Sequence, residues 1–235
     1  MIEIKNVYKS YGKRDILKNI SFSINKGDTL SIIGHSGCGK STLLLSLAGL
    51  IEVEKGEISD TFKDKALILQ NNSLFPWKTI KENIALGLIS KKYSNDYIQN
   101  SIDKIAKNLN IDYILNKYPH EVSGGELQRA SVARSLVLNP ELLLMDEPSS
   151  ALDSINKEKF QNLLCEIQNE YNLSYIIVTH NIEEAVILGK RIAIMDNGEI
   201  KKIIDNPYYG QMNIRKEYKF FDKCNEIRSL LESEN

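Results

Sequence analysis

Short apolar runs alternate along this chain with longer stretches in which apolar residues recur every three or four positions. Glycines fall near the ends of several runs, and this order is typical of an α/β fold with a mainly parallel sheet. The runs that predict strands buried on both faces span residues 30–33, 65–69, 142–145, 175–178 and 191–195.

Two segments near the start of the chain have a different pattern. Residues 2–7 and 16–24 alternate apolar and polar side chains, which favours half-exposed antiparallel strands. We therefore expect a small antiparallel β-layer beside the parallel sheet.

Stretches of helical period account for most of the remaining chain. The pattern is helical from about residue 80 to 138, which predicts a helical subdomain inserted at about 76–138. One apolar face of this subdomain is marked by Ile98, Ile102, Ile105 and Leu109. A further amphipathic helix is predicted around 160–167. The polar tail after Asp205 carries a weak helical stripe formed by Ile227, Leu230 and Leu231.

The composition limits the possible classes of protein. The chain has 235 residues, enough for one large domain or a domain with a subdomain. The net charge of -1 provides no strong overall field for nucleic acid or an anionic membrane. The three cysteines form no CxxC pair, which favours a reducing cytosol. Because signal-peptide and membrane-span patterns are missing, we expect a soluble chain that reaches a membrane through a partner.

Residues 34–41 carry the motif G-x-x-x-x-G-K-[ST] between a predicted strand and a helical stretch, which is the context of a phosphate-binding loop. Its glycines let backbone N–H groups turn toward phosphate oxygens. Lys40 would span the β- and γ-phosphates, and the Ser41 hydroxyl would bind Mg²⁺. The residues expected to contact nucleotide here are Gly34, His35, Ser36, Gly37, Cys38, Gly39, Lys40, Ser41 and Thr42.

Two adjacent carboxylates end the apolar run at 142–145. Asp146 would project from the carboxyl edge of the sheet, where ligands of α/β folds bind, and we expect it to hold Mg²⁺. Glu147 is one residue further on and would polarise a water for in-line attack on the γ-phosphate. The alternative is a solvated acidic turn, which the apolar context disfavours.

A second phosphate receptor is predicted at residues 123–126. Ser123 offers a hydroxyl, Gly124 and Gly125 offer unobstructed backbone N–H groups, and a helix begins at this point. A chain with two such receptors suggests two copies that share their nucleotides.

The motifs stand in the order found in ATP-binding subunits of ABC (ATP-binding cassette) transporters, and the chain resembles that family from about residue 1 to 205. The resemblance implies an α/β P-loop ATPase core with a mainly parallel sheet, an N-terminal antiparallel β-layer and an inserted helical subdomain. Residues 206–235 would form a short C-terminal tail.

The resemblance also implies roles for single residues. Tyr11 resembles the aromatic side chain that stacks on adenine, although Tyr8 is an alternative. Gln70 resembles the glutamine that touches Mg²⁺ and the attacking water, and His180 resembles the switch histidine that contacts the γ-phosphate. Asp153 resembles a residue that crosses between two nucleotide domains, and it also fits a helix N-cap.

In the implied mechanism, ATP lies between the phosphate loop of one copy and Ser123, Gly124, Gly125 and Glu126 of a second. Lys40, Glu147 and His180 would be catalytic, and Ser41, Gln70 and Asp146 would hold Mg²⁺. Closing and reopening of the pair would drive transmembrane permease subunits. The implied location is the cytoplasmic face of the membrane, with an extracytoplasmic solute-binding protein as an indirect partner and no nucleic acid.

Residues 70–77 join the core to the helical subdomain and carry the only tryptophan. Phe75 and Trp77 suit a groove for a short helix of a membrane subunit, or they fill the core of the subdomain. This stretch and the phosphate loop are similar to those of importers for nitrate, sulfonates, taurine and thiamine precursors, which implies uptake of a small polar or anionic solute.

The sequence departs from the family pattern at two places. Glu126 stands where the common motif has Gln, which adds charge near a shared phosphate site. The stretch from Gly56 to Gln70 is short, which makes the antiparallel layer less certain. The alternatives to a transport ATPase are a soluble ABC ATPase of translation or DNA repair, and a nucleotide-gated module without turnover.

Overall fold

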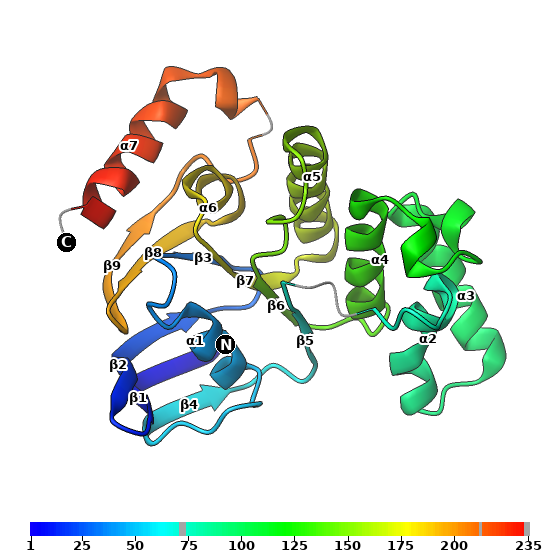
Figure 1. Cartoon of the computed structure of the whole chain (residues 1–235), viewed down its shortest axis with the longest axis horizontal. Helices are drawn as coiled ribbons and strands as arrows, with labels where there is room; N and C mark the ends of the chain where they lie inside the picture. Colours follow the sequence, from blue (N-terminus) through cyan, green and yellow to red (C-terminus); the bar gives the residue numbers. More distant parts are fainter. Residues whose placement is uncertain (71–73, 212, 233–235) are drawn as a thin grey trace.

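A six-stranded sheet forms the centre of the computed structural model, which describes residues 1–70, 74–211 and 213–232 (Figure 1). In spatial order its strands are β5 (Lys65–Ile68), β6 (Leu142–Asp146), β7 (Ser174–Thr179), β3 (Thr29–Ile33), β8 (Arg191–Asp196) and β9 (Glu199–Asp205). The first five are parallel, and the apolar runs of β6, β7, β3 and β8 are largely buried, as the sequence predicted. The predicted burial of residues 65–69 is wrong, because β5 lies at the edge of the sheet: only Ile68 is buried, and Leu69 lies beyond the strand and is 39% exposed.

The sixth strand, β9, was not predicted from the sequence. It pairs antiparallel with β8 after a turn in which Asn197 and Gly198 both have positive φ. An Asn-Gly pair between two strands is a strong hairpin signal, so the strand was recognisable. Two consecutive exposed lysines, Lys201 and Lys202, interrupt its alternation of apolar and polar residues. Exposed lysines are typical of an edge strand.

The predicted antiparallel layer is present and has three strands. They are, in spatial order, β2 (Arg14–Ile24), β1 (Ile2–Tyr11) and β4 (Lys55–Asp60). The short stretch after Gly56 therefore does not prevent β4 from joining the layer. Helix α1 (Lys40–Leu47) lies between this layer and the six-stranded sheet, where Leu43, Leu44 and Leu47 are fully buried.

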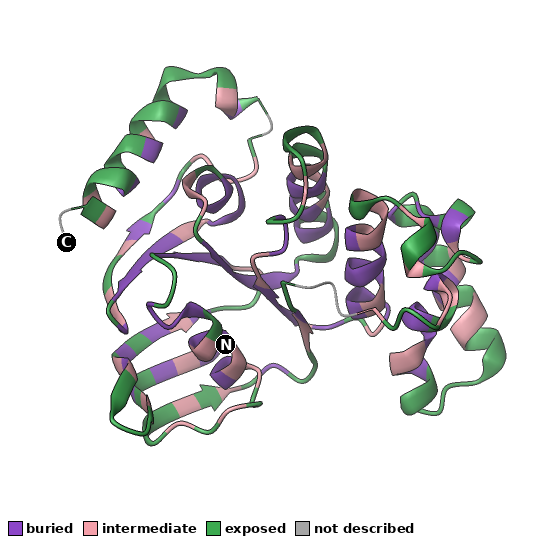
Figure 2. Ribbon diagram, viewed as in Figure 1, coloured by how far each residue is buried: buried purple, intermediate pink, exposed green. Residues whose placement is uncertain are grey.

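A second group of helices covers the opposite face of the large sheet (Figures 1 and 2). It comprises α5 (Ser154–Tyr171), α6 (Ile182–Leu188), the short 3-10 helix η3 (Ile214–Lys216) and α7 (Tyr218–Glu232). The weak apolar stripe predicted in the tail does lie on a helix, α7. The buried residues of this helix are Ile227, which belongs to the predicted stripe, and Phe220 and Cys224, which do not. These residues make the tail part of the core.

The helical subdomain lies beyond the β5 edge of the sheet (Figure 1). Its elements are α2 (Ile80–Ser90), α3 (Asn95–Asn108), η1 (Asp112–Ile114), η2 (Pro119–Glu121) and α4 (Gly124–Leu136). The predicted apolar face of α3 is confirmed, since Ile102, Ile105 and Leu109 are buried and Ile98 packs against the same cluster. Helix α4 contacts both β5 and α5, which joins the subdomain to the core.

Candidate nucleotide site

The phosphate loop joins the end of β3 to the start of α1, as its motif predicted. Gly39 has φ of 108°, and a Cβ there would lie 2.7 Å from the Ile16 carbonyl oxygen. At Gly34 a Cβ would lie 2.0 Å from the Met195 carbonyl oxygen. Side chains at these two positions would therefore distort the loop, which explains the spacing of the glycines.

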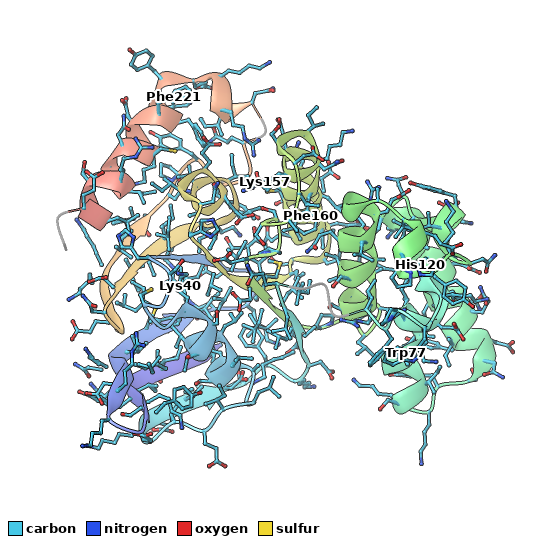
Figure 3. The ribbon with its side chains drawn as sticks, viewed as in Figure 1. Lys40, Trp77, His120, Lys157, Phe160 and Phe221 are labelled. Atoms are coloured by element: carbon cyan, nitrogen blue, oxygen red, sulfur yellow. The ribbon has the colours of Figure 1, made fainter. Side chains whose placement is uncertain are left out.

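Lys40, labelled in Figure 3, is the first residue of α1, and it is buried. Its Nζ donates hydrogen bonds of 2.8 Å to the carbonyl oxygens of Gly34 and His35. These bonds fix the ammonium group within the curve of the loop, where it favours an anion.

Three side chains from the ends of three strands meet beside the loop. Glu147 follows β6, and its Oε1 lies 2.9 Å from Nδ1 of His180, which follows β7. Its Oε2 accepts a 3.2 Å hydrogen bond from Nε2 of Gln70, which lies just after β5. The sequence predicted each residue separately, and the parallel strands bring them together.

The backbone at Glu147 has a left-handed conformation, with φ of 44°. Its N–H donates a 2.9 Å hydrogen bond to the carbonyl oxygen of Val178 in β7, and Pro148 follows. A non-glycine residue in this region is uncommon, and such residues concentrate at functional sites. The turn directs the carboxylate toward Gln70 and His180.

Asp146 is the last residue of β6, and it is half-buried. Burial raises the pKa of its carboxyl group and Glu147 adds to the rise, while a hydrogen bond from the Ser41 hydroxyl and the charge of Lys40 oppose it. The structure therefore brings together two of the three predicted magnesium ligands, Ser41 and Asp146.

A hollow of about 510 Å³ opens at this place. Its lining includes the predicted residues Ser36, Gly37, Gly39, Lys40, Ser41, Thr42, Gln70, Glu147 and His180. Arg14 and Ile16 of β2 also line it, and neither was predicted from the sequence. No local motif marks them, because they reach the hollow only through the packing of the antiparallel layer against the loop.

Apart from residues 123–126, five other residues predicted to bind nucleotide or magnesium are not part of the lining of the hollow: Tyr11, Gly34, His35, Cys38 and Asp146. Gly34 and Cys38 are buried within the loop, and His35 is exposed. Burial raises the pKa of the Cys38 thiol, although Lys40 opposes the rise. Tyr11 is 53% exposed at the end of β1, where it pairs with Arg14 across the hairpin.

Ser123 is the N-cap residue of α4, and Glu126 completes a capping box with it. Oε2 of Glu126 accepts hydrogen bonds of 2.7 Å from the backbone N–H and the hydroxyl of Ser123. Its Oε1 accepts a 2.7 Å bond from the Tyr113 hydroxyl. The hydrogen bonds of Ser123 and Tyr113 lower the pKa of Glu126 to about 2. Tyr113 was not predicted from the sequence, because no motif marks it.

The segment 123–126, all of which the structure describes, contributes no residue to the lining of the hollow. Gly124 and Gly125 have room around them, since a Cβ at either would meet only side-chain atoms at 3.4 Å or more. Gly124 is exposed and Gly125 is half-buried, so no side chain of their own covers the start of α4.

Two alternatives from the sequence can be compared with the structure. Asp153 is the N-cap of α5, and its Oδ1 accepts from the backbone N–H groups of Ile155 and Asn156. Phe75 and Trp77 are 41% and 69% exposed, with ring centroids 5.2 Å apart, so neither fills the core of the subdomain. Asn71 to Ser73 lie outside the described residues.

Three features together define a P-loop nucleoside triphosphatase. They are a glycine-rich loop between a strand and a helix, a buried lysine at the end of that loop, and acidic residues at the end of β6, which lies two strands away in the sheet. Among the residues that the structure describes, no helix is long and apolar enough to cross a membrane.

Comparison with known proteins gives the family. Residues 17–150 match the model of the ABC transporter family. An aliphatic sulfonates import ATP-binding protein, SsuB, of Bacillus anthracis is 40% identical over 211 residues, which cover 86% of this chain and 83% of that protein. The Fe(3+) ions import ATP-binding protein FbpC of Fusobacterium nucleatum is 37% identical over 86% of this chain, which spans only 57% of that relative.

A solved structure with bound ADP and Pi has a fold similar to that of this chain. The ATP-binding cassette MJ0796, described as a dimeric post-hydrolysis state bound to ADP and Pi, aligns with a TM-score of 0.78 and 32% identity. The alignment covers 87% of this chain and 98% of that one.

The chain belongs to the ABC transporter family and is an ATP-binding ATPase cassette of that family. The sequence-based resemblance and the fold class are confirmed. The relatives described above are transport proteins by name, which favours the transport hypothesis over a role in translation or DNA repair.

Proposed function

We propose that this chain is the ATP-hydrolysing subunit of a membrane importer and acts in pairs. One observation carries the proposal: of the two segments predicted to bind phosphate, the phosphate loop lines the hollow and residues 123–126 do not. Residues 1–205 would form the ATPase domain with the helical insertion at about 76–138, and residues 206–235 a short tail whose helix packs on the core of that domain.

The side chains around the hollow suit the steps of ATP hydrolysis. Lys40, held by two loop carbonyls, neutralises the terminal phosphates. Glu147 orients and polarises the attacking water. His180, with Nδ1 engaged by Glu147, contacts the γ-phosphate through its other ring nitrogen. Tyr11, at the end of β1 near Arg14, stacks on the adenine ring.

Oxygen atoms of Asp146, Ser41 and Gln70 would bind a magnesium ion. The Asp146 carboxyl and the Ser41 hydroxyl already form a hydrogen bond, and the pKa of Asp146 is raised by burial, so a cation would offset the cost of its charge. Gln70 donates to Glu147 through its amide nitrogen, which leaves its oxygen for the metal. When bound, the ion neutralises charge on the β- and γ-phosphates.

The second arrangement completes the site of another copy. Ser123, Gly124, Gly125 and Glu126 at the start of α4 would approach the γ-phosphate held by the phosphate loop of the partner. Asp153, at the start of α5, would lie at the same interface. The most economical partner is a second copy of this chain.

The permease contact would use the loop before α2. The fully buried side chain of Asn83 accepts a 2.7 Å bond from the Phe75 N–H and donates to the carbonyl oxygens of Phe75, Lys78 and Thr79. This network holds Phe75 and Trp77 at the surface on a fixed backbone. An exposed aromatic pair of this kind suits a short amphipathic helix of a permease subunit.

The proposed place of the chain is the cytoplasmic face of the membrane, where it binds the permease without spanning the bilayer. An extracytoplasmic solute-binding protein would deliver the cargo to the permease. We propose a small polar or anionic solute of the sulfonate, nitrate, taurine or thiamine-precursor type, because the similarity to a sulfonate importer subunit extends over most of both chains.

Co-purification tests the transport role. The chain, tagged and expressed in its native cell, should be recovered from detergent-solubilised membranes in a complex that contains a membrane permease and hydrolyses ATP. Trp77→Ala should reduce recovery of the complex while the isolated chain keeps its ATPase activity. Tyr218→Ala, which removes another highly exposed aromatic ring, is the control. Recovery with ribosomes or DNA in place of the permease would refute the proposal.

A further inference from the structure

Glu184 is a buried carboxylate whose surroundings are not explained by the residues described so far. It lies in the first turn of α6 and is 2% exposed. Within the described part of the chain, the groups that donate to its side chain are neutral: the Ser149 hydroxyl, the Thr179 hydroxyl and the Gln161 amide. Burying a carboxylate against neutral donors is costly, so a reason for its presence is needed.

The first candidate reason is helix capping, and the geometry excludes it. Glu184 is three residues after the N-cap Asn181, as Glu82 is after Thr79 and Glu126 after Ser123. Those two glutamates reach back to the backbone N–H of their own cap residue. The N–H of Asn181 instead donates to the Thr179 hydroxyl, while the Glu184 carboxylate reaches into a different part of the fold.

The two hydroxyls that Glu184 binds lie in the segments that carry the proposed catalytic pair. Ser149 is two residues after Glu147, and Thr179 directly precedes His180. Ser149 bonds to Oε1 of Glu184, and Thr179 donates a 2.6 Å bond to Oε2. One carboxylate therefore joins the loop after β6 to the end of β7, beneath the contact of 2.9 Å between His180 and Glu147.

The carboxylate is itself held from two sides. The Glu184 N–H donates a 2.8 Å bond to Oδ1 of Asn181, which fixes the first turn of α6. Gln161 of α5 donates to Oε1 at 3.4 Å, and the oxygen of the Gln161 amide accepts from Arg215 of η3. Because every member is buried or partly buried, a change at Glu184 is transmitted to both loops.

We infer that Glu184 is a positioning residue for hydrolysis, which holds the segments of Glu147 and His180 at the separation that the reaction needs. This inference rests on the proposed roles of Glu147 and His180. A small displacement of either group removes the alignment of water and γ-phosphate, and a misplacement of about 1 Å can lower a rate about 100-fold. Binding of ATP at the phosphate loop does not use these bonds.

The test compares Glu184→Gln with Glu183→Gln in the purified full chain, using ATP with magnesium. Both variants remove one negative charge from the first turn of α6, but Glu183 is exposed. Glu184→Gln should lower kcat by about 10- to 100-fold, with the dissociation constant for ATP within about two-fold of the wild-type value. Glu183→Gln should keep the wild-type kcat.

Three results separate the possible failures. An unchanged kcat in Glu184→Gln would overturn the inference and leave the proposed function intact. A parallel loss of ATP affinity, kcat and thermal stability would also overturn it, because a merely structural role predicts that pattern. Full hydrolysis by Glu147→Gln would instead contradict the proposed function.

A second pair of variants covers the case in which Glu184→Gln does not fold. Thr179→Val keeps the volume of the side chain and removes its hydroxyl, whereas Thr179→Ser keeps the hydroxyl. The serine variant should restore most of the kcat that the valine variant loses. Equal values of kcat in these two variants would contradict the inference. Combining Thr179→Val with Ser149→Ala should give less than the product of the two losses, since both act through one carboxylate.

Discussion

The hydroxyl of Ser123 donates a hydrogen bond of 2.7 Å to Oε2 of Glu126, three residues further along α4. In the isolated chain, the hydroxyl proposed to meet the partner's ATP is therefore already bound to a charged side chain of its own helix. Moving it to a phosphate requires that this bond be broken or shared, next to a carboxylate that repels the same phosphate.

Glu126→Gln should strengthen ATP-dependent pairing. Gln keeps an acceptor for the Ser123 hydroxyl but removes the negative charge, so the dissociation constant of the ATP-bound dimer should fall by about 2- to 5-fold, as expected for a partly exposed charge. Sedimentation in ATP on a hydrolysis-deficient background measures this. Glu121→Gln, on the neighbouring η2 turn, is the control, and equal pairing of all three proteins would contradict the expectation.

The effect of Glu126 should not vary with pH in the physiological range. The hydrogen bonds of Ser123 and Tyr113 lower the pKa of Glu126 in the folded chain to about 2. Its contribution to folding stability is therefore fully present above the unfolded pKa of about 4.3, where the carboxylate is also fully charged. It is lost only as the pH falls through about 2. The difference in pairing between wild type and Glu126→Gln should therefore be constant from about pH 6 to 8.

Tyr113→Phe should raise the pKa of Glu126. The Tyr113 hydroxyl donates to the ionised carboxylate, and its removal takes away one of the bonds that favour the charged form. Titration of the carboxyl carbons by NMR measures the shift. Glu82, in the capping box with Thr79, provides an internal control whose pKa should stay where it is. A constant pKa at Glu126 would mean that the Tyr113 contact does not persist in solution.

Glu147→Gln should remove most hydrolysis while ATP binding and pairing remain. Loss of a group that polarises water lowers kcat by about 100- to 10,000-fold. Single-turnover and steady-state ATPase assays measure the loss, and equilibrium binding of ATP shows whether affinity is kept. Glu166→Gln, on the exposed side of α5, should behave as wild type. Retained turnover in Glu147→Gln would remove this residue from the proposed mechanism.

Lys40→Ala should weaken ATP binding itself. The ammonium group is lost from the loop, and a charge-assisted hydrogen bond is worth about 1.5–3 kcal/mol, so affinity should fall about 10- to 100-fold. Calorimetry or equilibrium dialysis with ATP measures this. Lys159→Ala, which removes an exposed lysine of α5, is the control. Normal affinity in Lys40→Ala would contradict the phosphate-loop interpretation.

Two adjacent phenylalanines of α7 should differ in their contribution to stability. Phe220 is 2% exposed and Phe221 is 54% exposed. Phe220→Ala should lower the free energy of unfolding by about 3–5 kcal/mol, whereas Phe221→Ala should cost less than about 1.5 kcal/mol, mainly through the ring contact between the two. Denaturant unfolding measures both. Equal small losses would mean that the tail does not pack on the core in solution.

Much of the fold was predictable because its signals are local. The parallel strands are continuous apolar runs, and the phosphate loop is a contiguous motif that needs only its flanking strand and helix. The N-cap role of Asp153 also depends on residues within one turn, and it is confirmed. The strand β9 was missed because an exposed edge strand has a weak apolar pattern. The burial of Phe220 and Cys224 was missed because most residues of α7 are polar, so that the few apolar positions give a weak helical pattern.

The sequence alone determined the phosphate loop and the acidic pair at the end of β6, because each depends on residues that are close together in the chain, and it determined the order of the motifs. Tertiary structure decided the rest. It brought Gln70, Glu147 and His180 into contact, placed Arg14 and Ile16 in the hollow and joined Glu184 to Ser149 and Thr179. These contacts come from strand order and from the packing of layers, which bring together residues far apart in the chain and leave no local pattern in it.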